Sequence, residues 1–278
     1  MSRTAIAVVT VACVFLSATR HTIADDKRIA TLVDSAGVTT EVSELRFSTD
    51  ATRRFHSAYS AVVITAEPIE VAIDLADIRS IKGNEKKSEI VYVRLGKEAT
   101  IVGTLAQGNF TGKSDFGDVN IPISKLKGLT FPTLPGEKSA DEKKRLAERL
   151  SQNKAVLTLA DGTELSVSDL HRHDSYYSTE GYLIGGATRY NHYTDIRFKR
   201  GETLATLEFS KLKSVDFKAD KSLVVTLASG ATANGTPSNE AGAEFEGYSG
   251  TCESGTFFVA PERVKRIVFT PPQSTKKP

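Results

Sequence analysis

The chain has 278 residues, of which 40% are hydrophobic, and it carries 36 Lys and Arg against 34 Asp and Glu. This composition is typical of a globular protein with one or two domains. It excludes collagen-like, fully disordered and polytopic membrane proteins.

The N-terminus follows the pattern of a secretory signal peptide. Arg3 precedes an apolar run from Ala5 to Leu16, and a small-residue cleavage motif follows at Thr22–Ala24. The uncharged stretch of residues 4–19 is shorter than the roughly 18 to 20 residues that a membrane-spanning helix needs. We therefore predict that residues 1–24 are removed on export to the periplasm or the extracellular space, with a retained membrane anchor as the alternative.

Export changes the charge and cysteine content. Removing residues 1–24 takes away Arg3 and Arg20 and no acidic residue, which leaves 34 basic against 34 acidic residues. A protein held on nucleic acid normally shows a basic excess, so we predict no nucleic-acid partner. Cys252 is the one cysteine left, so an internal disulfide and a cysteine-based zinc site are excluded.

The chain repeats a short phrase four times: a turn, an aliphatic anchor, a basic residue and an alternating strand. The anchors are Ile78, Leu126, Leu212 and Val264, with spacings of 48, 86 and 52 residues. The spacings pair the four units as one with two and three with four. We therefore predict two copies of a two-unit module at residues 29–131 and 155–269.

Two further matches support the duplication. Thr31–Asp34 reappears as Thr158–Asp161, and Val42–Leu45 reappears as Val167–Leu170. Within each unit, apolar residues alternate and are interrupted by turns such as Asp161-Gly162, a hairpin signal. The fold class is therefore predicted as all-β, either four small barrels or two larger sandwiches.

A short helix is expected between the copies, within a linker at residues 132–153. Ser139 and Glu142 form a capping box, and Leu146 and Leu150 lie one helical turn apart. The tail at residues 270–278 has too little apolar content to pack, and we predict it to be disordered.

The phrase from Asp115 to Phe131 resembles a unit found in many uncharacterised exported bacterial proteins. Those units are thought to be small SH3-like or Sm-like β-barrels. The resemblance implies tandem small barrels and an envelope or extracellular setting, and it implies no particular activity.

The candidate binding residues gather in two segments rich in tyrosine, histidine and arginine. Their rings have a flat apolar face and a polar edge, which suits stacking on sugar rings or holding a protein partner. The alternative is that they cover the end of a barrel. The second-half residues are Tyr176, Tyr177, Tyr182, Arg189, Tyr190, His192 and Tyr193, and the first-half residues are Arg54, Phe55, His56 and Tyr59.

Metal binding and catalysis have weaker signals. His171, His173, His192 and Asp174 could ligate a metal, but they form no tight motif, and we predict no metal site and no cofactor. Cys252 and Ser254 lie in a phrase like the nucleophile turn of trypsin-like proteases, without a matching His and Asp arrangement. We predict no catalytic residue.

The sequence therefore favours a non-catalytic exported β-repeat protein that binds or scaffolds an envelope polysaccharide or an envelope protein, without stable membrane insertion after cleavage. Two alternatives stay open. One is a hydrolase of envelope or extracellular polymer, with acids such as Glu240, Glu244 and Glu246 near the aromatic segment. The other is a structural subunit of a homo-oligomer whose strands pair edge to edge.

Overall fold

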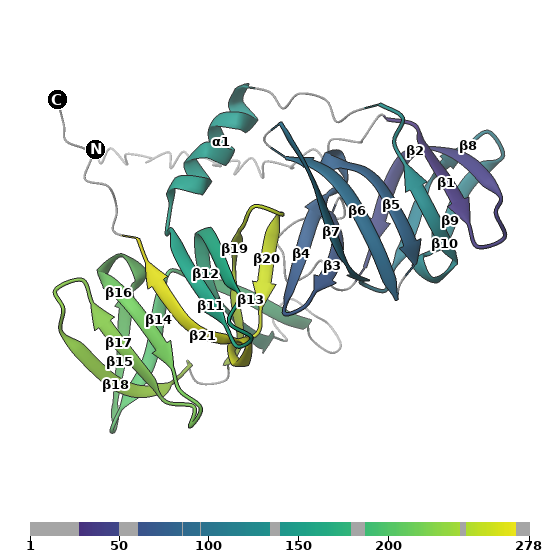
Figure 1. Cartoon of the computed structure of the whole chain (residues 1–278). Coiled ribbons are helices and arrows are strands. Elements are labelled where there is room, and N and C mark those ends of the chain that lie inside the picture. Colours follow the sequence, from purple (N-terminus) through teal and green to yellow (C-terminus); the bar gives the residue numbers. More distant parts are fainter. Residues whose placement is uncertain are drawn as a thin grey trace, which may run out of the picture.

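The computed structural model describes residues 28–49, 61–84, 86–94, 96–133, 140–178, 187–239 and 243–270. The fold is all-β, as predicted. Twenty-one strands of the described residues form one continuous network of antiparallel ladders, and the first half of the chain lies beside the second (Figure 1). The predicted signal peptide, the predicted capping residue Ser139 and tail residues 271–278 lie outside the described residues.

The described residues of the first half form ten strands and two short 3₁₀ turns. They are β1 (Ala30–Asp34), β2 (Thr39–Ser48), β3 (Ala61–Ala66), β4 (Ile69–Asp74), η2 (Leu75–Asp77), β5 (Ile78–Asn84), β6 (Lys87–Arg94), β7 (Lys97–Leu105), β8 (Asn109–Ser114), β9 (Gly117–Pro122), η3 (Ile123–Lys125) and β10 (Leu126–Thr130).

The second half begins after the helix α1 (Ala140–Ser151), and its described residues form eleven strands. They are β11 (Ala155–Leu159), β12 (Glu164–Ser178), β13 (Ala187–Tyr193), β14 (Asp195–Arg200), β15 (Thr203–Glu208), η4 (Phe209–Lys211), β16 (Leu212–Phe217), β17 (Leu223–Leu227), β18 (Thr232–Pro237), β19 (Ala243–Thr251), β20 (Thr256–Val259), η5 (Pro261–Arg263) and β21 (Val264–Phe269).

Ladder contacts in the first half follow two rings. One ring runs β10–β1–β2–β8–β9 and returns to β10 through η3. The other runs β5–β6–β7–β3–β4 and returns to β5 through η2. A ladder between β5 and β10 joins the two rings. The second ring uses the consecutive strands of residues 61–105, whereas the first ring combines β1 and β2 with β8, β9 and β10 from the other side of that segment.

Every ladder of the first half has a counterpart in the second. The rings there are β21–β11–β12–β19–β20, closed through η5, and β16–β17–β18–β14–β15, closed through η4. The ladder between β16 and β21 joins them. Among the described strands, β13 alone has no counterpart; it pairs with the far end of β12.

Local irregularities recur at matching places. The anchors Ile78, Leu126, Leu212 and Val264 each begin a strand directly after a 3₁₀ turn. Glu44 in β2 and Asp169 in β12 have positive φ angles of 53° and 51°, and both lie at a shift in ladder register. Short polar bulge residues tolerate this left-handed conformation better than β-branched ones do.

One sequence match is wrong by two positions. Asp34 lies opposite Leu126, and Leu159 lies opposite the matching anchor Val264, so Asp34 corresponds to Leu159 rather than to Asp161. Asp34 and Asp161 look alike in sequence because each accepts a hydrogen bond from the backbone N–H two residues later. Both are turn-forming residues, but they stand at different points of their turns.

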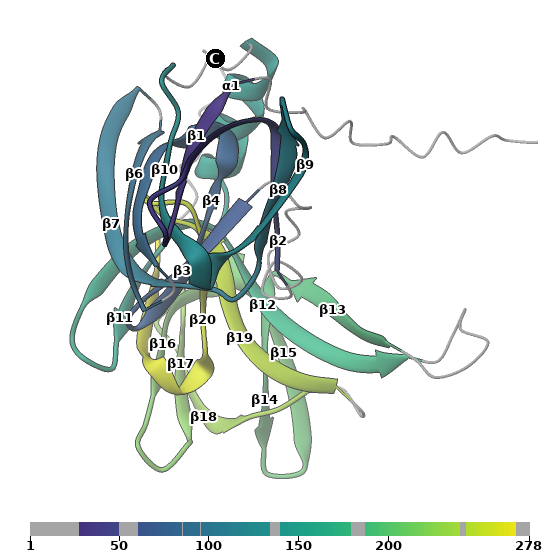
Figure 2. The same cartoon turned by 90° about the vertical axis from the view of Figure 1, so that its right-hand side faces the viewer.

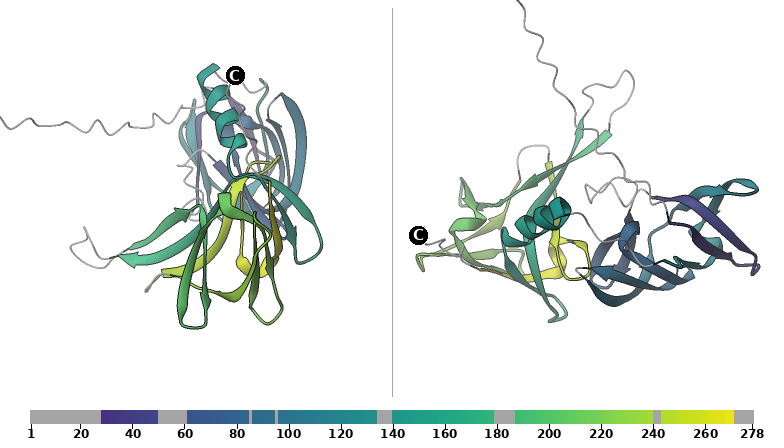
Figure 3. Two further views of the ribbon diagram at one scale, coloured as in Figure 1. Left: turned by 90° about the vertical axis from the view of Figure 1, so that its left-hand side faces the viewer. Right: turned by 90° about the horizontal axis from the view of Figure 1, so that it is seen from above.

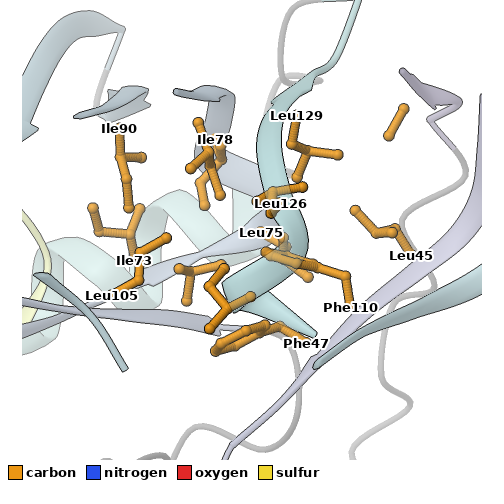
Figure 4. Packing of buried hydrophobic residues seen from close by; sticks show 14 of the residues in the cluster. Leu45, Phe47, Ile73, Leu75, Ile78, Ile90, Leu105, Phe110, Leu126 and Leu129 are labelled. Carbon is orange, nitrogen blue, oxygen red and sulfur yellow. The ribbon is translucent and has the colours of Figure 1, made fainter. Parts of the chain in front are cut away.

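Each half has its own hydrophobic core. In the first half, alternate strand residues point inward from both rings, and Phe47 and Phe110 meet with ring centroids 4.7 Å apart (Figure 4). In the second half, the core includes Leu157, Phe198 and Ile267. Strand alternation explains both cores, because every second side chain lies on the same face of a strand.

A ladder between β4 and β20 connects the halves. It pairs Phe257 with Val71 and Phe258 with Glu70. A small apolar cluster of Ala61, Val63, Ala72 and Phe258 covers this junction. The helix α1 packs beside β12, with Leu146 and Leu150 half-buried, and Arg149 in its last turn pairs with Asp169.

Candidate functional site

The hairpin of β12 and β13 projects from the body of the second half (Figures 2 and 3). β12 has 15 residues, whereas its counterpart β2 has 10. Its first part belongs to the ring, and its last part pairs with β13 on one side and with β19 on the other. Among the described strands, the hairpin is therefore an addition to the pattern that the two halves share.

The predicted binding residues of this hairpin are divided between its two faces. Residues opposite each other in a ladder share a face. Tyr176 lies opposite Arg189, and Arg172 lies opposite Tyr193; on the other face Tyr177 lies opposite Thr188. Tyr190 and His192 share the face of Tyr177. Tyr177 is 66% exposed, and Arg189 is exposed as well.

The remaining predicted binding residues lie outside the described residues. They are Tyr182, Arg54, Phe55, His56 and Tyr59.

The inner face of the hairpin carries a buried group of charges. Arg172 is 2% exposed, and its Nη2 donates to Asp174 Oδ2 over 2.8 Å. Its Nη1 lies 3.5 Å from Asp195 Oδ1, which also lies 3.6 Å from Arg197 Nε. The ring of Tyr193 lies 4.8 Å from the Arg172 guanidinium and 4.6 Å from that of Arg197. Two cations and two carboxylates balance, so this cluster holds no excess charge.

Arg172 occupies a position that is apolar in the first half. Arg172 lies opposite Tyr248 in the β12–β19 ladder, and Phe47 lies opposite Phe110 in the β2–β8 ladder. The same comparison matches Asp195 to Ala61, because Asp195 pairs with Glu208 as Ala61 pairs with Asp74. The second half therefore carries a costly ionic network where the first half has hydrophobic packing.

A small cavity of about 10 Å³ adjoins this charged cluster. Arg172, Arg197, Tyr248 and Asn239 are among its lining residues. A cavity of this size holds about one water molecule. Burial raises the pKa of the Tyr248 phenol well above its ordinary value, so this hydroxyl stays neutral. The cavity is too small for a sugar or a cofactor. The charged cluster can therefore anchor the hairpin, but it has no room to bind such a ligand.

The opposite face brings a serine and two histidines together. Ser249 Oγ lies 2.6 Å from His173 Nε2, and the rings of His173 and His192 meet with centroids 3.7 Å apart. A serine and a histidine at this distance resemble a nucleophile and its base. However, Ser249 is 5% exposed and His173 is fully buried, so a polymer substrate has no access to this pair in the structure.

His171 lies at the edge of this group, with its ring centroid 6.1 Å from that of His192, and it also takes part in a contact between the hairpin and the helix. Its Nε2 lies 2.9 Å from Asp169 Oδ1, while Arg149 Nε donates to Asp169 Oδ2 over 3.0 Å. Burial raises the pKa of the Asp169 carboxyl, but the hydrogen bonds from His171 and Arg149 outweigh burial and leave it below its ordinary value. Within the described part of the chain, no three His, Cys, Asp or Glu side chains are arranged to hold a metal ion.

Cys252 and Ser254 belong to the turn between β19 and β20. The backbone N–H of Cys252 donates to the carbonyl of Gly255 over 2.8 Å, which closes the turn. Burial raises the pKa of the Cys252 thiol, which disfavours the reactive thiolate. A methyl group on Gly255 would lie 2.5 Å from the carbonyl oxygen of Ala72, so this glycine permits the close approach of β20 to β4.

A second cavity, of about 210 Å³, opens beside this turn between the two halves. Its lining includes Arg94 and Lys97 from the first half, Leu150 from α1, and Thr251 and Glu253 from the second half. Of the acids near the aromatic segment, Glu246 accepts a hydrogen bond from Ser175 Oγ over 2.5 Å, and Glu240 lies outside the described residues.

No protein-family model matches the chain, and no curated protein and no solved structure matches it significantly. Among the described residues, no helix combines the length and the hydropathy that crossing a bilayer requires.

The sequence drew attention to the tyrosine-rich segment but gave no sign of the charges that hold it. Arg172, Asp174, Asp195 and Arg197 lie in no motif, and Ser249 has no neighbour in sequence that marks it. Extending the sequence match of Val42–Leu45 with Val167–Leu170 by two residues would have pointed to Arg172, because it sets a charged residue against Phe47.

Proposed function

We propose that the chain is an exported, non-catalytic scaffold protein that binds envelope polysaccharide through the β12–β13 hairpin. In this proposal the chain consists of two copies of a module of two small barrels, with α1 as the helical linker between them. The matching ladders of the two halves support this arrangement.

The observation that carries the proposal is the hairpin itself. Within the described residues, the rings of the first half close with no strand that corresponds to β13. The second half adds β13 and replaces buried apolar positions by Arg172 and Asp195 to hold it. Buried charges seldom add stability over hydrophobic packing, so a role other than folding explains their presence.

Both faces of the hairpin offer groups suited to a sugar polymer. Tyr177 is exposed, Tyr190 on the same face is half-buried, and Arg189 is exposed on the other face. Aromatic rings stack on the apolar faces of sugar rings, and a guanidinium donates hydrogen bonds to hydroxyl or carboxylate oxygens. The charge of the processed chain is balanced, so this binding would not rest on general attraction to polyanions.

The test is co-sedimentation of the purified chain with insoluble peptidoglycan, cellulose and chitin. We expect the double variant Tyr177→Ala/Tyr190→Ala to lose about tenfold or more in affinity, because two stacking faces are removed. The matched control is Tyr177→Phe/Tyr190→Phe, which keeps both rings and should retain most of the binding. Equal binding by the parent and the alanine variant would contradict the site, and binding to none of the polymers would favour an envelope protein as the partner.

A further inference from the structure

The two halves meet through strands that hold the same place in their rings. β4 directly precedes η2, and β20 directly precedes η5. In each half the same two rings are joined by the strands that follow these turns, β5 with β10 and β16 with β21. The four rings therefore form a row (Figure 1). Within each half two rings are joined by the strands after the turns, and the halves are joined by the strands before the turns, β4 and β20.

In the two outermost rings of the row, the strands that correspond to β4 and β20 each have one edge without a ladder partner among the described residues. Among the described residues, β9 pairs with β8 alone and β15 pairs with β14 alone. β9 corresponds to β20, and β15 corresponds to β4. In Figure 1 they lie at opposite ends of the molecule.

We propose that β9 of one chain pairs with β15 of a second copy, in the antiparallel register of the internal β4–β20 ladder. The inference rests on the two-copy arrangement proposed above. The internal ladder pairs Thr256 with Ala72 and Phe258 with Glu70. The corresponding contacts place Asp118 opposite Thr206 and Asn120 opposite Leu204. Because the two edges differ, the contact is head-to-tail and continues into an open row of chains.

Exposed apolar side chains at both ends support this pairing. Phe116, in the turn before β9, is 98% exposed, and Leu204 in β15 is 48% exposed. Phe116 corresponds to Ser254, which is half-buried at the internal junction. Large exposed apolar groups on open strand edges mark sites of association.

A glycine and a pair of opposite charges also support the pairing of β9 with β15. Gly117 has open space around it, whereas its counterpart Gly255 receives the carbonyl of Ala72 at the internal junction. Across that junction Arg263 lies 3.4 Å from Glu67. At the open ends, Lys125 takes the place of Arg263, and Glu202 lies one residue beyond the position of Glu67, so the complementary signs are kept.

The contact between chains should be weaker than the internal one. The cluster of Ala61, Val63, Ala72 and Phe258 buries the internal junction. The corresponding residues at the open ends are Asp195, Arg197, Thr206 and Asn120. Less apolar surface is removed from water, so the association should be reversible and dependent on concentration.

The test is sedimentation velocity over about a hundredfold range of concentration. The sample is the full chain, purified in the form that the cell produces. We expect the average mass to rise with concentration. Phe116→Ser and Leu204→Glu each remove one of the exposed apolar side chains, and each should weaken association by about tenfold or more. Val102→Ser is the matched control, since Val102 is 49% exposed but lies in β7, away from both edges.

Mixing the two variants distinguishes a head-to-tail contact from a symmetric one. The Phe116→Ser chain keeps an intact β15 edge, and the Leu204→Glu chain keeps an intact β9 edge. Their mixture should therefore form dimers that grow no further. A second mixture, of Asp118→Cys and Thr206→Cys chains, should give a disulfide-linked dimer on mild oxidation, which checks the register.

A parent chain that stays monomeric over the whole range, or Phe116→Ser and Leu204→Glu variants that associate like the parent, would overturn the proposal. Neither result bears on polysaccharide binding, which is measured through Tyr177 and Tyr190. The two proposals can therefore fail separately.

Discussion

Arg172 is the residue at which the two halves differ most in physical character. It fills a core position that Phe47 fills in the first half, and it is held by Asp174, Asp195 and the ring of Tyr193. A buried guanidinium is tolerated only where carboxylates and an aromatic face replace its hydration. The charge network therefore fastens the hairpin to the ring as one unit.

Removal of this guanidinium should be costly. We expect Arg172→Met to lower the free energy of unfolding by about 3–5 kcal/mol, because the buried Asp174 carboxylate would lose its ion pair with the guanidinium. The measurement is urea unfolding followed by circular dichroism. The control is Arg79→Met, which breaks an exposed pair with Glu98 and should cost at most about 1 kcal/mol. Similar costs for the two variants would contradict the anchoring role.

At the level of elements, a strand that pairs with one neighbour along most of its length and with another neighbour at its end needs a glycine where the partner changes. β7 pairs with β6 along most of its length and with β3 at its end, and β18 pairs in the same way with β17 and β14. At the crossing, a methyl group on Gly103 would lie 2.2 Å from the carbonyl oxygen of Thr65, and one on Gly235 would lie 2.3 Å from that of Lys199.

Replacement of either glycine by alanine should lower the free energy of unfolding to a similar extent. We expect Gly103→Ala and Gly235→Ala each to cost at least about 2 kcal/mol, because the added methyl group meets backbone that cannot move without breaking a ladder. The control is Gly230→Ala, which has a φ of 90° and open space, and which should cost about 1 kcal/mol. Thermal or urea unfolding of the three variants measures the difference, and a tolerated Gly235→Ala would contradict the crossing role.

On the scale of the whole molecule, the junction between the halves depends on a short ladder and on one close approach. Ile69 packs against the cores of both halves, and Gly255 lets the Ala72 carbonyl come near. The ladder covers three residue pairs, so its stability is sensitive to small displacements. The cavity that Arg94 and Thr251 line lies beside it.

We therefore expect Gly255→Ala to loosen the junction while both cores stay folded. Hydrogen exchange of the amides in β4 and β20 should become at least about tenfold faster, and exchange in β1 and β17 should not change. Gly117→Ala is the matched control, since nothing lies near Gly117 within the chain. Unchanged exchange in β4 would show that the close approach at Gly255 is not limiting.

The sequence by itself determined the local elements of this protein. Alternating apolar residues predicted strands, and the anchors Ile78, Leu126, Leu212 and Val264 all begin strands after short turns. The helix was predicted from Leu146 and Leu150, and the tyrosine-rich segment was recognised as distinctive. These features depend on neighbours a few residues away, so their physical causes can be read from a single stretch of chain.

Only the tertiary structure decided which strands share a ring and which side chains meet. Strand pairing joins residues far apart in sequence, and a shift of two positions, as at Asp34 and Asp161, leaves the alternation of apolar residues intact while changing every partner. For the same reason no pattern placed Arg172 against Asp195, Ser249 against His173, or β4 against β20. Those contacts arise from the curvature and closure of the rings, which depend on the whole network of ladders at once.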